Sequence, residues 1–222
     1  MIWMLLIVVA LIVTLSVLVY KHDNTEFAQL TGYSFFDIVF NAKKGHLYKL
    51  MTQLDKVTGE HKVLIDLQLR VDNTIYPVDA VLIHESGLYI IDGVNKTGWI
   101  SGHEAHDEWI ETKHQEKQET FPNPILVNQR IVLALRDLLP EVNEDAYVAI
   151  SLFSDACSFQ KVELYSQNVE VMKRNELKLW TKQIGGEVLS MEDIHTIYKV
   201  LEGYMSFKQQ PVKEASKQPI IN

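Results

Sequence analysis

The chain has 222 residues, of which 47% are hydrophobic, and a formal net charge of −8; this suits one ordinary folded domain with an appendage. The negative charge excludes the broad basic face through which nucleic-acid-binding proteins usually release counterions, although it is compatible with a small local groove. The single cysteine, Cys157, excludes an internal disulfide framework and fits a reducing compartment, where we expect it to be a packing residue rather than a nucleophile.

The N-terminal segment is apolar and uncharged from Ile2 to Tyr20. As a helix, these nineteen residues would span roughly 28 Å at 1.5 Å per residue, close to the thickness of a bilayer core. A cleaved signal peptide would need a basic start, a shorter apolar run and a small-residue cleavage site. We therefore predict a membrane anchor at residues 1–21, with the lipid bilayer as the partner of residues 2–20. A cleaved signal is the alternative.

The charges around this segment bear on its orientation. Lys21 follows it at once, Lys43 and Lys44 come later, and neither Lys nor Arg precedes it. The positive-inside rule therefore predicts a single-pass protein of the cell membrane with a cytoplasmic C-terminal domain, while Asp23 and Glu26 make this charge signal a thin one.

A folded domain is predicted over residues 43–206, after a juxtamembrane linker at 22–42 whose Phe35-Phe36 pair lies at the membrane interface or packs on the domain. The domain begins with a helix over residues 43–56, where apolar residues recur at the i, i+3, i+4, i+7 spacing. Three strands then form a meander, because apolar runs are separated by the turn residues Asp72-Asn73 and Glu85-Ser86-Gly87: the strands are 61–71, 75–83 and 88–94.

The next segment, residues 95–123, is polar and is predicted to contain one short hairpin around Trp99 and Trp109, followed by a charged loop. A helix begins at Asn123-Pro124, since proline suits the first turn, and residues 146–153 have the pattern of a buried strand. Because the helix crosses between this strand and the strand at 88–94, we expect the two strands to pair in parallel.

The C-terminal part is predicted to contain two short strands near residues 162–164 and 169–172 and a final helix at 189–205. Ser190 and Asp193 form a capping box at the start of that helix. The tail at residues 207–222 is rich in proline, lysine and glutamine and is expected to be disordered.

Two predicted strands each carry a carboxylate within an apolar run, Asp79 and Asp92. Such a group is costly to bury unless it is paired, hydrogen-bonded or bound to a metal. A two-residue loop at Glu85-Ser86 would place Asp79 opposite Asp92, and one at Ser86-Gly87 would place it opposite residue 94; a three-residue loop would separate the acids. Two carboxylates on one face can coordinate a hard cation such as Mg²⁺.

This order of elements resembles the PD-(D/E)xK nuclease fold, and specifically the nuclease-related domain (NERD) family, from about Lys43 to about Phe153. The resemblance implies an α/β fold with a helix, a three-strand meander, a helix and a strand, as in restriction endonucleases. It rests on the order and spacing of these residues: Lys44-Gly45, 78–83, 87–92, Asn95, Gly98-Trp99-Ile100, Gly102, Trp109, Asn123-Pro124, Asn128, Ala134 and Leu135.

For an active member, the resemblance implies metal-assisted phosphodiester hydrolysis. An Asp on the second strand and a Glu on the third hold the metal, and a Lys two residues later activates the water. In this chain Asp79 matches the Asp, Asp92 stands at the Glu, and Val94 stands at the Lys. Lys49 and Val127 replace a Glu on the first helix and a Gln after the Asn-Pro pair.

These departures predict a domain that keeps the fold and has lost, or nearly lost, hydrolysis, because valine cannot orient a water and Lys49 would repel a cation. We therefore expect a membrane-tethered binding or scaffold module with an unidentified protein partner and no cofactor. The alternative is an active Mg²⁺-dependent nuclease acting on DNA or RNA near the membrane. In that case Asp79 and Asp92 bind the metal, and Lys96 joins them as a catalytic residue if the strand continues past Val94.

Two other groups could carry chemistry, and both have a simpler interpretation. His103, Glu104, His106 and Asp107 could bind a metal, but their polar setting favours a solvated loop. Trp99 and Trp109 could stack on a nucleobase, but large aromatic residues more often cover the end of a sheet.

Overall fold

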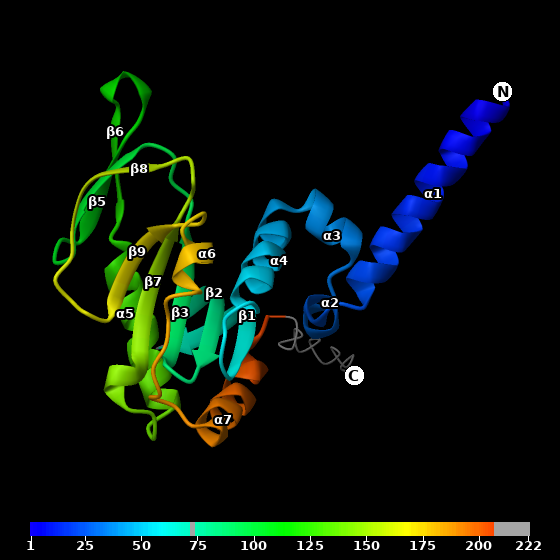
Figure 1. Cartoon of the computed structure of the whole chain (residues 1–222). Coiled ribbons are helices and arrows are strands. Elements are labelled where there is room, and N and C mark those ends of the chain that lie inside the picture. Colours follow the sequence, from blue (N-terminus) through cyan, green and yellow to red (C-terminus); the bar gives the residue numbers. More distant parts are fainter. Residues whose placement is uncertain (72–73, 207–222) are drawn as a thin grey trace, which may run out of the picture.

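The computed structural model describes residues 1–71 and 74–206, and it arranges the strands in two β-sheets (Figure 1). The larger sheet has the strand order β1-β2-β3-β7-β9, and the smaller sheet has the order β6-β5-β4-β8. The predicted α/β class is confirmed. The strands have these bounds: β1 His61–Val71, β2 Thr74–His84, β3 Gly87–Val94, β4 Trp99–His103, β5 Glu108–Thr112, β6 Gln118–Pro122, β7 Tyr147–Phe153, β8 Ser158–Glu163 and β9 Val169–Lys173.

The N-terminal helix α1, Ile2–Asp23, projects away from the sheets (Figure 1). It is long and apolar enough to cross a membrane, and the apolar window that meets this test is not buried against the rest of the chain. The other helices have these bounds: α2 Glu26–Thr31, α3 Phe35–Phe40, α4 Ala42–Leu54, α5 Pro124–Leu138, α6 Leu177–Trp180 and α7 Met191–Leu201, with short 3₁₀ turns at His114–Glu116, Glu144–Ala146 and Glu202–Tyr204.

The main core lies around the larger sheet. Helix α4 contributes the apolar face predicted from the sequence, with Leu47, Leu50 and Leu54 all buried. Consecutive residues of β2, such as Leu82 and Ile83, are both fully buried, so both faces of this sheet are covered.

The β2–β3 hairpin has the two-residue loop Glu85-Ser86, because His84 pairs with Gly87. This is the first of the alternatives considered from the sequence. The parallel pairing of β3 with β7 across α5 is also as expected.

The smaller sheet has more strands than the single hairpin predicted from the sequence. The hairpin of β4 and β5 is present, but the segment expected to be a charged loop contains strand β6, which pairs with β5. The error arose from the alternating charges of residues 113–119. Two of them form an ion pair, with Lys113 Nζ 2.5 Å from Glu119 Oε2, so they belong to an ordered sheet edge. Strand β8 pairs with β4 in parallel.

The segment expected to be a linker, residues 22–42, is folded onto the domain. Helices α2 and α3 lie within it, and Phe27 is 3% exposed as part of the main core. At the other end, helix α7 begins with the predicted Ser190–Asp193 capping box but ends at Leu201, before a 3₁₀ turn. The predicted turn at Asp72-Asn73 and the tail at 207–222 lie outside the described residues.

Asn123 joins the two sheets at the start of α5. Its side-chain oxygen accepts the N–H of Ile125 at 2.9 Å, and its Nδ2 donates to the carbonyls of Glu104 and His106 at 2.8 and 2.7 Å. The side chain is buried, so it satisfies both the helix end and the β4–β5 turn without water.

We expect Asn123→Ala to lower the free energy of unfolding by roughly 2–4 kcal/mol, because it removes a helix cap and leaves buried carbonyls unsatisfied. Urea unfolding of the full chain in detergent measures this change. Asn143→Ala is the matched control, since Asn143 caps an exposed 3₁₀ turn, and it should change stability by less than about 1 kcal/mol. Equal effects of the two variants would contradict this role.

Candidate functional site

Three carboxylates lie at one level across strands β1, β2 and β3. The ladder pairs on either side of Asp66 place it opposite Asp79, and the β2–β3 register, continued by one pair, places Asp79 opposite Asp92. We call Asp66, Asp79 and Asp92 the acid row. Asp66 has a φ of +50°, in the left-handed region that Asp tolerates better than most residues.

Asp79 and Asp92 were predicted as site residues from their strands, whereas Asp66 was not. A signal was present, because a two-residue turn at Asp72-Asn73 would have set residue 66 opposite residue 79. The three acids are spaced 13 residues apart (79 − 66 = 92 − 79).

Asp79 and Asp92 are partly buried and face one another across β2 and β3. The carboxylate of Asp79 lies over Gly93, where an added Cβ would stand 2.5 Å from Asp79 Oδ2. Burial, and then the negative charge of Asp79, raise the pKa of Asp92 to about 7, although backbone N–H groups of Gly93 and Asp79 partly oppose the shift. The pair therefore has a strong tendency to hold a proton or to attract a cation.

Helix α4 brings two basic side chains to this row. Lys43 Nζ donates to Asp66 Oδ1 at 2.9 Å, and this bond, assisted by the charge of Asp79, raises the pKa of Lys43. His46 Nε2 lies 3.5 Å from Asp79 Oδ2, and both side chains are largely buried. That nitrogen makes no hydrogen bond to any residue that the structure describes. His46, rather than Lys49, is the α4 side chain next to Asp79.

Asp66 is also a structural junction. Its carboxylate accepts hydrogen bonds from Tyr33, Lys43 and Ser206. Burial alone would raise the pKa of Asp66, but the bonds from Ser206 and Lys43 hold it below its usual value. Asp66 therefore ties the α2–α3 connection, α4 and the end of the described chain to the sheet.

Lys96 is directed elsewhere. Strand β3 ends at Val94, and Lys96 Nζ lies 3.1 Å from Glu111 Oε2 and 4.7 Å from the centre of the Phe121 ring. Glu111 is 2% exposed. Burial alone would raise its pKa, but hydrogen bonds from the N–H groups of Thr97 and Gly98 and from Lys96 lower it. The structure thus brings Asp79 and Asp92 together and does not bring Lys96 to them.

Three further residues stand where the family pattern has a catalytic or site residue, and each has a distinct surrounding in the fold. Lys49 lines a cavity of about 780 Å³ together with His46 and Arg174. Val94 packs against the core of the smaller sheet, and Val127 packs against the main core.

Among the described residues, the acid row leaves only two of its three carboxylates free of a basic partner that donates to them. Two facing carboxylates are available, while the third acid of the row is already bound to Lys43. Within residues 1–71 and 74–206, no group of three or more His, Cys, Asp or Glu side chains is arranged to hold a metal. Mg²⁺ keeps several waters and is usually held by one or two carboxylates, a number that Asp79 and Asp92 supply, while the charge of the Lys43 ammonium group near Asp79 opposes a cation there.

The family model of the nuclease-related domain matches residues 43–154, from the start of α4 to just beyond β7. The chain belongs to the nuclease-related domain (NERD) family. The predicted resemblance is confirmed, and the whole acid row lies inside the NERD match. An uncharacterized protein of Bacillus anthracis is 23% identical over 124 residues, which is 56% of this chain and 57% of that relative. The chain thus spans little more than half the length of this relative.

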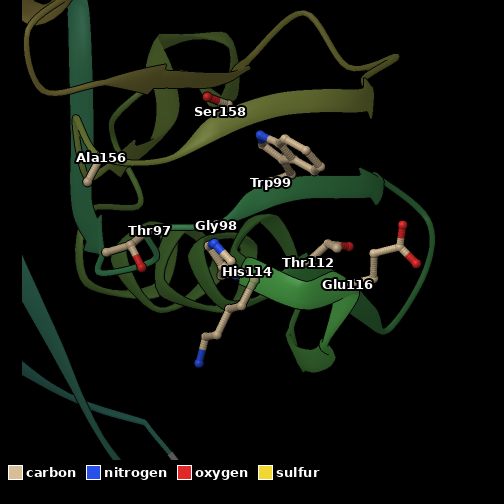
Figure 2. Close-up of a pocket in the computed structure, with 9 residues that line it drawn as sticks. Thr97, Gly98, Trp99, Thr112, His114, Glu116, Ala156 and Ser158 are labelled. Atoms are coloured by element: carbon tan, nitrogen blue, oxygen red, sulfur yellow. The ribbon is translucent and has the colours of Figure 1, made fainter.

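A second hollow lies on the smaller sheet of the NERD domain (Figure 2). Trp109 is fully buried, and its indole N–H donates to the carbonyl of His103. Trp99 is 55% exposed, so its ring is accessible. The hollow has a volume of about 440 Å³ and is lined by Thr97, Gly98, Trp99, Thr112, Lys113, His114, Glu116, Ala156 and Ser158.

The segment 103–107, expected to be a solvated loop, has a buried member. Glu104 is 8% exposed and accepts the N–H groups of Tyr165 and Ser166 at 2.6 and 3.0 Å. His103 and His106 stack on one another with ring centres 4.5 Å apart. Glu104 therefore links two loops of the smaller sheet.

We expect the Asp92 carboxyl to make the protein less stable as the pH rises. Because the pKa of Asp92 is about 7 in the folded chain against an ordinary 3.8, its stabilising contribution is complete below pH 4 and is lost as the pH rises through 7. Asp92→Asn should therefore be more stable than the parent at pH 8, by up to about 4 kcal/mol for three pKa units.

Urea unfolding between pH 4 and pH 8 measures this difference. Asp193→Asn is the control with the opposite sign, since hydrogen bonds from Ser190 lower the pKa of Asp193. That variant should lose stability at pH 8 relative to the parent. Parallel pH profiles for the parent and Asp92→Asn would show that Asp92 does not titrate as described.

Proposed function

We propose that this NERD protein is a single-pass membrane protein whose domain binds a partner and does not hydrolyse phosphodiesters. One observation carries the proposal: the acid row has basic side chains of its own chain beside it. Lys43 binds Asp66 and adds its charge to the field at Asp79, and His46 contacts Asp79. The ammonium group of Lys43 thus brings to the acid row a positive charge of the kind that a divalent cation supplies in a nuclease.

The missing water-activating group strengthens the proposal. Val94 has no acid or base, and Lys96 is paired with the buried Glu111. Moving Lys96 to the acid row would leave Glu111 buried with less compensation, and removing one partner of a buried pair typically costs 3–5 kcal/mol. Lys96 therefore remains with the smaller sheet.

Helix α1 supports the membrane location. Its apolar residues match a bilayer in length, and Lys21, Lys43 and Lys44 on the C-terminal side favour a cytoplasmic domain at the cell membrane. The partner bound by the domain is a protein. Trp99 offers one accessible aromatic ring for a nucleic acid, but the net charge of −8 opposes a large phosphate-binding surface.

Purified full chain should not cleave plasmid DNA or single-stranded RNA when Mg²⁺ or Mn²⁺ is added. The parent, Asp79→Ala and the control Asp107→Ala, which alters an exposed acid outside the row, should give equal background in a gel assay. Cleavage by the parent and by Asp107→Ala that disappears in Asp79→Ala would refute the proposal and establish the Mg²⁺-dependent nuclease.

The membrane anchor makes a separate prediction. The full chain should stay in the membrane pellet after an alkaline carbonate wash, and mass spectrometry of the mature protein should find the N-terminal residues still attached. Replacing Leu11 and Ile12 by Lys places two charges at the bilayer centre, at roughly 3 kcal/mol each, and should move the protein to the supernatant. A soluble mature protein that begins after residue 20 would identify a cleaved signal instead.

A further inference from the structure

Helix α3 is fixed rigidly to the domain. Ser34 and Asp37 form a capping box at its start, and Lys44 Nζ lies 2.6 Å from Asp37 Oδ1. The backbones of α3 and α4 are in contact, because a Cβ added at Gly45 would stand 2.6 Å from the carbonyl oxygen of Ile38. These contacts fix the position of α3 relative to α4.

One side of α3 is apolar and uncovered. Phe36, Val39 and Phe40 are 47%, 55% and 82% exposed, and their spacing of three and four residues sets them on one side of the helix. The rings of Phe36 and Phe40 stack with centres 6.3 Å apart. The other side packs inward, since Ile38 contacts the main core. We call Phe36, Val39 and Phe40 the α3 apolar face.

This face lies beside the end of the membrane-spanning helix. Phe36 shares a hollow with the last turns of α1, and Figure 1 shows α3 next to the C-terminal half of α1. The α1 residues of this hollow are Leu15, Ser16, Val19, Tyr20 and Asp23. The two helices are held in this relation by His22, which is 4% exposed and donates from Nε2 to the carbonyl of Tyr33 at 2.8 Å.

The length of α1 determines how deep in the bilayer the α3 apolar face lies. A hydrocarbon core needs about 20 apolar helical residues, so the whole stretch from Ile2 to Tyr20 is required to cross it. Leu15 then lies about 7.5 Å inside the level of Tyr20, at 1.5 Å per residue. Phe36 lines one hollow with α1 residues from Leu15 to Asp23, so it lies at the level where α1 leaves the hydrocarbon core, where interfacial helices bury their apolar side to roughly 5–10 Å.

We propose that the α3 apolar face is inserted into the bilayer surface and fixes the orientation of the NERD domain against the membrane. The inference rests on the proposed anchoring by α1. Lys43 and Lys44 follow Phe40 after Asn41 and Ala42 and mark the water boundary. Because Lys43 also binds Asp66, the acid row lies close to the membrane, and a partner that reaches it is itself held at the bilayer.

The test places an environment-sensitive nitrobenzoxadiazole probe at single cysteines of the full chain in phosphatidylcholine–phosphatidylglycerol vesicles. Cys157 is 1% exposed, and burial raises the pKa of its thiol, so the parent takes up little label and gives the background. The probe sites are Phe40→Cys in the α3 apolar face, Leu11→Cys in α1 and Val188→Cys. Val188 is the matched control, an exposed apolar residue in the segment before α7.

We expect doxyl-labelled lipids to quench the probes at positions 40 and 11 and aqueous iodide to quench the probe at position 188. Adding Phe36→Glu to Phe40→Cys should release the probe at 40 to iodide while α1 stays inserted, which separates insertion of the helix face from insertion of the dye. A quenched probe at 11 with an iodide-accessible probe at 40 would overturn this inference and leave the anchor intact. A probe at 11 that lipid does not quench would remove the anchor and this inference together.

Discussion

The ion pair between Lys43 and Asp66 is the interaction on which the rest of the arrangement depends. It joins the first turn of α4 to the edge strand β1 of the larger sheet, and Tyr33 and Ser206 bind the same carboxylate. The Asp66 carboxylate thereby holds four parts of the chain together: the α2–α3 connection, α4, β1 and the segment at Ser206. Because α3 is fixed to α4, this junction also fixes the side of the domain that faces α1.

The same pair changes the chemistry of the acid row. A nuclease of this fold leaves carboxylate charge uncompensated so that a divalent metal completes it. In this chain a lysine and a histidine stand beside the carboxylates, and the residue two positions beyond Asp92 is Val94. The fold is thus retained, and the ammonium group of Lys43 compensates the charge of Asp66. The negative charges of Asp79 and Asp92 remain less well compensated, and the raised pKa of Asp92 reflects this.

Much of the larger sheet could be predicted from the sequence, because its strands are continuous apolar runs and α4 has a clear helical spacing. The hairpin register was left with two alternatives that kept the acids together, since one residue of turn length decides it. Asp66 was missed because the register of β1 against β2 depends on the length of the turn at Asp72-Asn73, and only a two-residue turn sets residue 66 opposite Asp79. His46 was missed because the rotation of α4 against the sheet, which no local pattern encodes, decides whether it or Lys49 meets Asp79. Strand β6 was missed because its ion-paired charges look like those of a solvated loop.

The central claim is that the chain's own basic groups take the place of a metal at the acid row. Titration of the full chain with Mn²⁺ at pH 7.5, followed by electron paramagnetic resonance of the free ion, tests it most directly. The account predicts that the parent leaves Mn²⁺ free and that Lys43→Met, which removes the ammonium group and keeps a similar side-chain length, binds it more tightly than the parent. Stoichiometric Mn²⁺ binding by the parent that is lost in Asp79→Asn would contradict it.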